Sequence, residues 1–170
     1  MNISSEKSTL SILKEITFLE SFTDDELNNL IQLGVTSQVE AHSNVIIEGE
    51  SSWGLYIILS GLVGIYKKNK LTKSQFDIGQ LRAGSFFGEM SLIDGDPRSA
   101  TVRTLTSSQL FYISKDSFQS FITHTSDLES RFYSSCIKTL VKRLRELNDD
   151  YVVSQYQLWQ VALKKEVKLK

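Results

Sequence analysis

One short stretch of the sequence, residues 87–101, holds residue types suited to binding a phosphorylated sugar. Gly88 has no Cβ, so a ligand can approach the backbone closely there. Arg98 carries a planar guanidinium that can donate to two phosphate oxygens at once, and the hydroxyl of Ser99 can add a neutral donor. Glu89 supplies an acceptor suited to a ribose hydroxyl. Together these residues predict an anion site within one loop.

The same stretch has a second interpretation, which these few residues leave open. Glu89 and Arg98 could form an internal ion pair that braces the loop, and for a lone Glu and Arg this is the commoner role. In favour of a ligand, residues Glu89–Leu92 can form one helical turn, whose free backbone N–H groups near Gly88 suit an anion. The backbone of Ala100 adds a further neutral donor beside Arg98.

The complete string resembles the phosphate-binding cassette of the cyclic nucleotide-binding domain family. The family's pattern is an apolar residue, Gly-Glu, a variable residue, a small residue and an apolar residue, followed after a spacer by Arg and a small-Ala pair. Every position is matched, by Phe87, Gly88, Glu89, Ser91, Leu92, Arg98, Ser99 and Ala100. A pattern of this length is more specific than an isolated Gly-rich triplet, so it favours the ligand-binding interpretation.

An upstream segment, residues 45–61, resembles a second pattern of the family: a strand, a Gly-acidic turn, four apolar residues and a Gly. Ser52 departs from it, because the family usually has Gly, Ala or Cys there. Serine is small, so little consequence is expected. In the order of its elements the chain is similar to the sensor domain of bacterial catabolite activators and to regulatory-subunit domains of protein kinase A.

The resemblance implies a β-roll that holds a cyclic nucleotide, with Glu89 on the ribose 2′-hydroxyl and Arg98 with Ser99 on the cyclic phosphate. Ile65 and Leu81 would line the sugar and base, although ordinary core packing is an equal alternative for both. Residues on the C-terminal helix would contact the base, with a solvated helix face as the alternative for Arg143 and Asn148. The implied ligand-binding residues are Phe87, Gly88, Glu89, Met90, Ser91, Arg98, Ser99, Ala100, Ile65, Leu81, Arg143, Leu147 and Asn148.

The expected ligand is cyclic AMP, with cyclic GMP as the alternative. In parts of the family a Thr after the phosphate-binding Arg is associated with cyclic GMP, whereas this chain has Ser99. No cofactor or metal is expected, because His42 and His124 stand far apart in the sequence. Phosphodiester hydrolysis usually needs clustered metal ligands, so the chain is not expected to be an enzyme.

Turn residues predict the elements that must position this site. All nine glycines lie between Gly34 and Gly95, and the only proline is Pro97. Thr23 and Glu26 have capping-box spacing at the start of a helix that Gly34 would end. The predicted strands, rich in β-branched and aromatic residues, are Val35–Ala41, Val45–Glu48, Leu55–Leu59, Gly61–Lys67, Gln75–Leu81, Ala100–Leu105 and Gln109–Ile113.

From Asp127 onward the apolar period changes to that of a helix. Apolar residues recur at spacings of three, four or seven, interrupted by the small polar Ser154: Ile137, Leu140, Leu144, Leu147, Tyr151, Leu158 and Val161. A helix of about 40 residues exceeds the usual globular length and cannot pack wholly on one small domain. We therefore expect its far half to form a homodimer.

The expected fold is α+β, a β-roll or jelly-roll of about eight antiparallel strands flanked by N-terminal helices and a long C-terminal helix. The expected parts are N-terminal helices (1–34), the roll with its cassette 87–101 (35–114), and C-terminal helices that act as lid and dimerisation element (115–170). The chain has a net charge of −1, and its sequence shows neither a membrane-spanning segment nor a signal peptide. We therefore expect a cytoplasmic protein that binds neither DNA nor membrane. The favoured function is a sensor domain without an effector domain; the alternative is the sensor part of a catabolite-activator-type regulator that lacks its DNA-binding domain.

Overall fold

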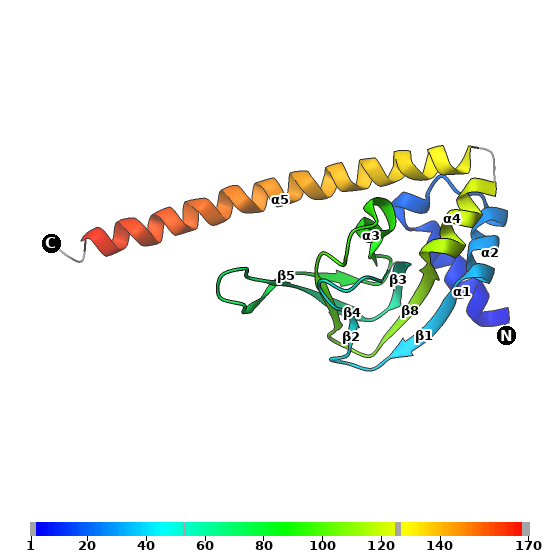
Figure 1. Ribbon diagram of the computed structural model, residues 1–170, viewed down its shortest axis with the longest axis horizontal. Coiled ribbons are helices and arrows are strands. Elements are labelled where there is room, and N and C mark those ends of the chain that lie inside the picture. Colours follow the sequence, from blue (N-terminus) through cyan, green and yellow to red (C-terminus); the bar gives the residue numbers. More distant parts are fainter. Residues whose placement is uncertain (1–2, 53, 125–126, 168–170) are drawn as a thin grey trace.

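The computed structural model describes residues 3–52, 54–124 and 127–167, and the side chains of residues 9–160 within these ranges. Two four-stranded antiparallel sheets form a roll, with helices gathered at one end of it and one long helix running across it (Figure 1). The predicted class, a jelly-roll flanked by helices, is confirmed. No helix within the described ranges is long and apolar enough to cross a membrane.

The two sheets have the strand orders β1-β8-β3-β6 and β2-β7-β4-β5. Their strands are β1 (Val35–Val39), β2 (Asn44–Ile46), β3 (Gly54–Ser60), β4 (Leu62–Lys68), β5 (Gln75–Arg82), β6 (Phe86–Phe87), β7 (Thr101–Thr104) and β8 (Ser108–Ser114). The seven predicted strands are confirmed to within a few residues. The eighth, β6, was missed because two residues are too few to show an alternating pattern.

An apolar layer between the sheets comes from both of them. Its buried residues are Ile46, Ile58, Val63, Phe87, Val102 and Leu110. Strands β4 and β6, which carry the predicted residues Ile65 and Phe87, contribute buried side chains to this layer, and the predicted Leu81 of β5 is half-buried and packs against it. The roll is therefore a packed scaffold, and the cassette begins at Phe87 within it.

The N-terminal helices are α1 (Ile3–Lys14), the short 3-10 turn η1 (Thr17–Leu19) and α2 (Asp24–Leu33). The predicted capping box is confirmed, since Glu26 N donates to Thr23 Oγ1 at 3.3 Å and Thr23 N donates to the Glu26 carboxylate at 2.7 Å. Gly34 ends α2, but in an extended conformation with φ of −103°. Glycine is required there because a Cβ would lie 2.1 Å from the Phe111 ring.

The C-terminal part consists of α4 (Lys115–His124) and α5 (Leu128–Val167). The start of α5 packs into a second core shared with α1, α2, η1 and α4, where Leu128, Phe132 and Cys136 are buried. Beyond it, α5 passes over the side of the roll that carries α3 (Glu89–Asp94) and continues well past the strands (Figure 1). At 1.5 Å per residue, its 40 residues span about 60 Å.

The predicted apolar seam of α5 lies largely in solvent. More than half of the side-chain surface is exposed at Ile137, Leu144, Leu147, Tyr151 and Leu158. Leu140 is half-buried, and the side chain of Val161 lies outside the described residues, as do those of the lysines at the end of the chain. Nothing within the described residues covers this stripe.

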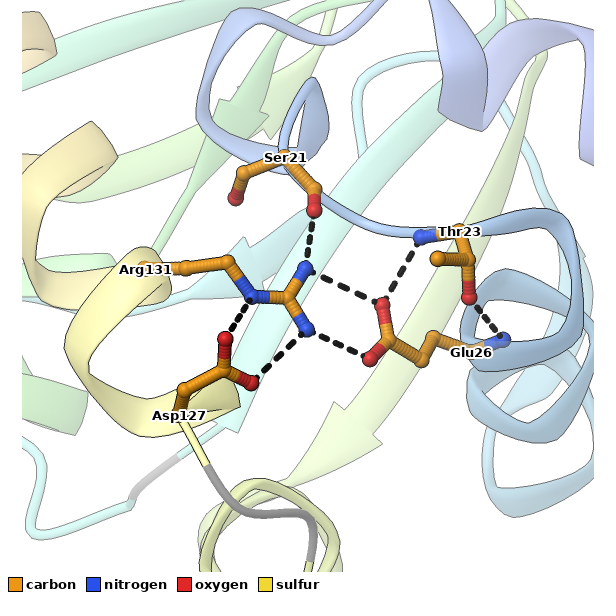
Figure 2. Close-up of polar contacts among 5 residues, drawn as sticks. All are labelled: Ser21, Thr23, Glu26, Asp127 and Arg131. Carbon is orange, nitrogen blue, oxygen red and sulfur yellow. Dashed lines mark hydrogen bonds and ion pairs between the residues drawn. The ribbon is translucent and has the colours of Figure 1, made fainter.

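A cluster of charges fastens the start of α5 to the N-terminal helices (Figure 2). Arg131 on α5 donates to the Glu26 carboxylate at 2.6 Å and to the backbone oxygen of Ser21, and forms an ion pair with Asp127 at 3.4 Å. Burial raises the pKa of the Glu26 carboxyl, but hydrogen bonds from Arg131 and Thr23 outweigh burial, so the net pKa lies below its usual value. Glu26 thus both caps α2 and anchors α5.

Candidate functional site

The cassette begins where β6 leaves the roll. Gly88 has φ of +85°, a left-handed conformation that glycine adopts without strain, and it caps the helix α3. The predicted helical turn is confirmed and extends two residues further, to Asp94. A Cβ on Gly88 would lie 2.5 Å from Nη1 of Arg98 and 2.7 Å from the oxygen of Gly54. Glycine is therefore needed here both for its backbone conformation and for the close approach of Arg98.

Arg98 lies under the loop with only 3% of its surface exposed. Its Nη1 donates to the backbone oxygens of Gly54 at 3.0 Å and Gly88 at 3.1 Å, and its Nε donates to Ser52 Oγ at 3.2 Å. The guanidinium carbon lies 5.9 Å from the centroid of the Tyr56 ring. Burial lowers the pKa of Arg98, since the charged form loses hydration.

All the acceptors that hold Arg98 are uncharged. Within the described residues its second terminal nitrogen, Nη2, makes no hydrogen bond. The carboxylates of Glu50 and Glu89 act on Arg98 only through charge, and burial outweighs them. An anion that bonds directly to this buried cation lowers the cost of burying it. The arrangement is therefore suited to binding a phosphate group.

Glu89 is buried, with 6% of its surface exposed, at the first position of α3. The sequence left open an ion pair with Arg98, and that interpretation is wrong: the carboxylate pairs with Arg143 of α5 through Oε1. Arg143 also donates to the oxygen of Phe86 at 3.3 Å and lies 4.4 Å from the centroid of its ring. Oε2 of Glu89 has no hydrogen-bond partner among the described residues, so it is available to a hydroxyl group.

The remaining cassette residues lie around these two charges. Ser91 is buried and Met90 is exposed at the loop surface, where Ser99 Oγ donates to its sulfur at 3.5 Å. Ala100 is half-buried at the end of the loop. Lys67 of β4 donates to the backbone oxygen of Ser99 and pairs with Glu48 at 2.9 Å. Lys67 and Glu48 were not predicted, because no spacing in the sequence relates them to the cassette.

Three of the predicted residues lie on strands: Phe87 on β6, Ile65 on β4 and Leu81 on β5. Phe87 is buried and stacks on the Tyr56 ring, with 5.0 Å between centroids and 3° between planes. Ile65 and Leu81 are half-buried and pack against the inner apolar layer that contains Phe87. Both keep exposed surface that a ligand could cover, so core packing and ligand contact both remain open for them.

Of the three residues predicted on α5, the fold brings only Arg143 to the cassette. Leu147 is 64% exposed, and Asn148 is exposed as well. Contact of either residue with a bound base would require α5 to move toward the roll or a ligand to bridge the space between them. Their role stays a prediction.

One further side chain lies close enough to the charges of the site to be affected by them. Cys136 of α5 is buried, and burial raises the pKa of its thiol to about 12, which makes it unreactive. Within the described ranges, no group of three or more His, Cys, Asp or Glu side chains is placed to hold a metal ion.

An eight-stranded roll that presents a buried arginine and a buried glutamate on one loop defines a binding module for a small anionic ligand. The family model for the cyclic nucleotide-binding domain matches residues 36–125, more than half of the chain. The chain therefore belongs to the cyclic nucleotide-binding domain family.

Individual relatives agree with this assignment. The chain is 33% identical over 107 residues to a cAMP-dependent protein kinase regulatory subunit of Yarrowia lipolytica, covering 63% of this chain and 28% of that protein. It is 34% identical over 113 residues to a cGMP-dependent protein kinase of Plasmodium berghei, covering 66% of this chain and 12% of that protein. It thus spans only a small part of these relatives. A solved cyclic nucleotide-binding domain from Methylobacillus flagellatus superposes with a TM-score of 0.73 at 25% identity, over 84% of this chain and 80% of that one.

Proposed function

We propose that this chain binds cyclic AMP through residues 87–101 and reports its level as a sensor domain. The observation that carries the proposal is Arg98, a buried guanidinium held by neutral acceptors, whose Nη2 has no hydrogen-bond partner among the described residues. Arg98 and Ser99 bind the cyclic phosphate, and Glu89 accepts from the ribose 2′-hydroxyl through Oε2. Gly88 and Ala100 let the backbone approach the phosphate, and Phe87, Met90 and Ser91 shape the loop.

The choice of cyclic AMP over cyclic GMP rests on Ser99, where a threonine would favour cyclic GMP. The relatives described above are a regulatory subunit of a cAMP-dependent protein kinase and a cGMP-dependent protein kinase, so they do not discriminate between the two ligands. Ile65 and Leu81 contact the sugar and base from the roll. Leu147 and Asn148 contact the base only when α5 lies closer to the roll.

The signalling part of the proposal concerns α5. Arg143 joins α5 to Glu89, so a ligand at Glu89 is sensed directly by this helix. Residues 115–170 then act as lid and as the contact of a homodimer, residues 35–114 as the binding roll and residues 1–34 as supporting helices. We propose a cytoplasmic module that is not itself an enzyme, needs no cofactor or metal, and does not bind DNA or membrane through these residues.

The alternative is the sensor part of a transcription regulator of the catabolite-activator type. The exposed seam of α5 is the observation that favours it, because in such regulators the dimer helix leads into a DNA-binding domain. The two functions differ in the sequence that follows α5 in the complete gene product. A helix-turn-helix segment there would favour the regulator.

Calorimetric titration with cyclic AMP and cyclic GMP tests the binding proposal, with 5′-AMP as a control ligand. We expect cyclic AMP to bind more tightly than the other two. Arg98→Lys retains the charge but loses the guanidinium fork, so affinity should fall at least about tenfold, the loss of one charged hydrogen bond. An Arg98→Lys protein that is folded and binds with unchanged affinity would exclude this site.

A further inference from the structure

We propose that Ser52 is a positioning residue for Arg98 and thereby sets the affinity of the phosphate site; the proposal rests on the function given above. Ser52 lies just before β3, 46 residues from Arg98 in the sequence. Its Oγ accepts from Arg98 Nε at 3.2 Å. It is the only side-chain acceptor of Arg98 among the described residues, because the other two acceptors are the backbone oxygens of Gly54 and Gly88.

The position of these three bonds explains why the hydroxyl matters. The backbone oxygens both bind Nη1, so they fix one corner of the planar guanidinium. Without a bond at Nε the guanidinium is held by hydrogen bonds at the single nitrogen Nη1 and can tilt about it. The bond from Nε to Ser52 adds a second point of attachment and holds Nη2 in one direction. A guanidinium that is already oriented loses less entropy when it binds an oxyanion.

The uncharged nature of Ser52 is equally important. A hydroxyl orients the guanidinium but does not neutralise it, so the charge of Arg98 remains available to the ligand. Arg98 is buried, and burial outweighs the attraction of the nearby Glu50 and Glu89 carboxylates, so the charge remains costly in the free protein. Ser52 itself is exposed, so its replacement removes a hydrogen bond without opening a cavity in the core.

The test compares Ser52→Ala with Ser52→Thr, which keeps the hydroxyl, and with Ser51→Ala. Ser51 is the adjacent exposed serine, and among the described residues it is not a hydrogen-bond partner of Arg98. Calorimetry with cyclic AMP measures affinity. In parallel, NMR of the ligand-free proteins measures solvent exchange of the Arg98 Nε–H, a signal assigned by its loss in Arg98→Lys. The exchange rate of the Nε–H reports the hydrogen bond and the solvent access of that group, a local property that affinity alone does not measure.

We expect Ser52→Ala to weaken binding about tenfold and to accelerate exchange of the Nε–H, while Ser52→Thr and Ser51→Ala stay close to the unmodified protein. Unchanged affinity or unchanged exchange in Ser52→Ala would overturn the proposal, and so would an equal effect of Ser51→Ala. Failure of the unmodified protein to bind any cyclic nucleotide would instead refute the proposed function. In that case the exchange measurement still decides whether Ser52 orients Arg98.

Discussion

The absence of a Cβ at Gly88 permits both the backbone conformation of the site and the close approach of Arg98. The residue turns the chain with φ of +85° and lets the Arg98 guanidinium lie against the backbone of the loop. Gly84 has almost the same backbone conformation, with φ of +81°, but nothing lies within 4 Å of its Cβ position. A side chain at Gly84 would therefore cause backbone strain alone, whereas a side chain at Gly88 would cause similar strain and also collide with Arg98.

This difference gives a prediction for alanine substitutions. Gly84→Ala should cost about 1–2 kcal/mol of unfolding free energy, the strain of a left-handed alanine, and leave nucleotide affinity unchanged. Gly88→Ala should cost at least as much and also weaken binding about tenfold or more, because Arg98 must move. Urea unfolding and calorimetry on both variants measure these effects. Equal affinities in the two variants would show that the contact between Gly88 and Arg98 does not matter for binding.

Among the elements, α5 has two different attachments to the rest of the molecule. Its start is fixed to α2 through Arg131 and Glu26, whereas its middle meets the cassette through Arg143 and Glu89. A packed core together with a charge cluster resists movement more than the contacts of one half-exposed side chain, Arg143, do. Any ligand-driven movement of α5 should therefore begin beyond the buried Cys136 and leave the cluster around Arg131 in place.

The cluster around Arg131 predicts how stability depends on pH. The pKa of Glu26 is lower in the folded protein than its usual 4.5, so the unfolded chain binds more protons as the solution becomes acidic. The stabilisation is complete above the unfolded pKa and is lost as pH falls through the folded pKa. We expect Glu26→Gln to be less stable than the unmodified protein near neutral pH and to lose less stability on acidification.

Urea unfolding at fixed protein concentration, from near neutral pH to below the usual glutamate pKa, measures this difference. Glu15→Gln is the matched control, because Glu15 is an exposed glutamate of the same N-terminal region. The control should follow the pH dependence of the unmodified protein. If Glu26→Gln also followed it, Glu26 would not anchor α5 through its charge.

For the whole molecule, the exposed seam of α5 predicts a dimer. Leu144 lies within the seam and Val153 lies on another face of the helix, and the two are exposed to similar extents, 57% and 55%. Leu144→Asp would place a charge at a coiled-coil contact and should dissociate the dimer. Val153→Asp adds the same charge outside the seam and should leave the dimer intact. Analytical ultracentrifugation at tens of micromolar protein measures both, and an unmodified protein that is monomeric there would refute the dimer.

The sequence by itself determined the class of fold and the location of the cassette. Turn residues, alternating apolar residues and the capping box act over a few neighbours, and the backbone conformations that they favour are largely independent of the rest of the chain. For the same reason the cassette could be located by a pattern confined to residues 87–101. The two-residue strand β6 could not be predicted from local sequence patterns, because it forms only by pairing with β3.

Only the tertiary structure decided which partner each charged residue has. Glu89 is paired with Arg143, 54 residues away, and Arg98 is held by Ser52, 46 residues away, in place of the nearby pairing of Glu89 with Arg98 that the sequence left open. These contacts depend on how β3, the cassette and α5 pack against one another. Spacing along a chain carries no information about such distances, because they are set by the packing of elements that are remote in sequence.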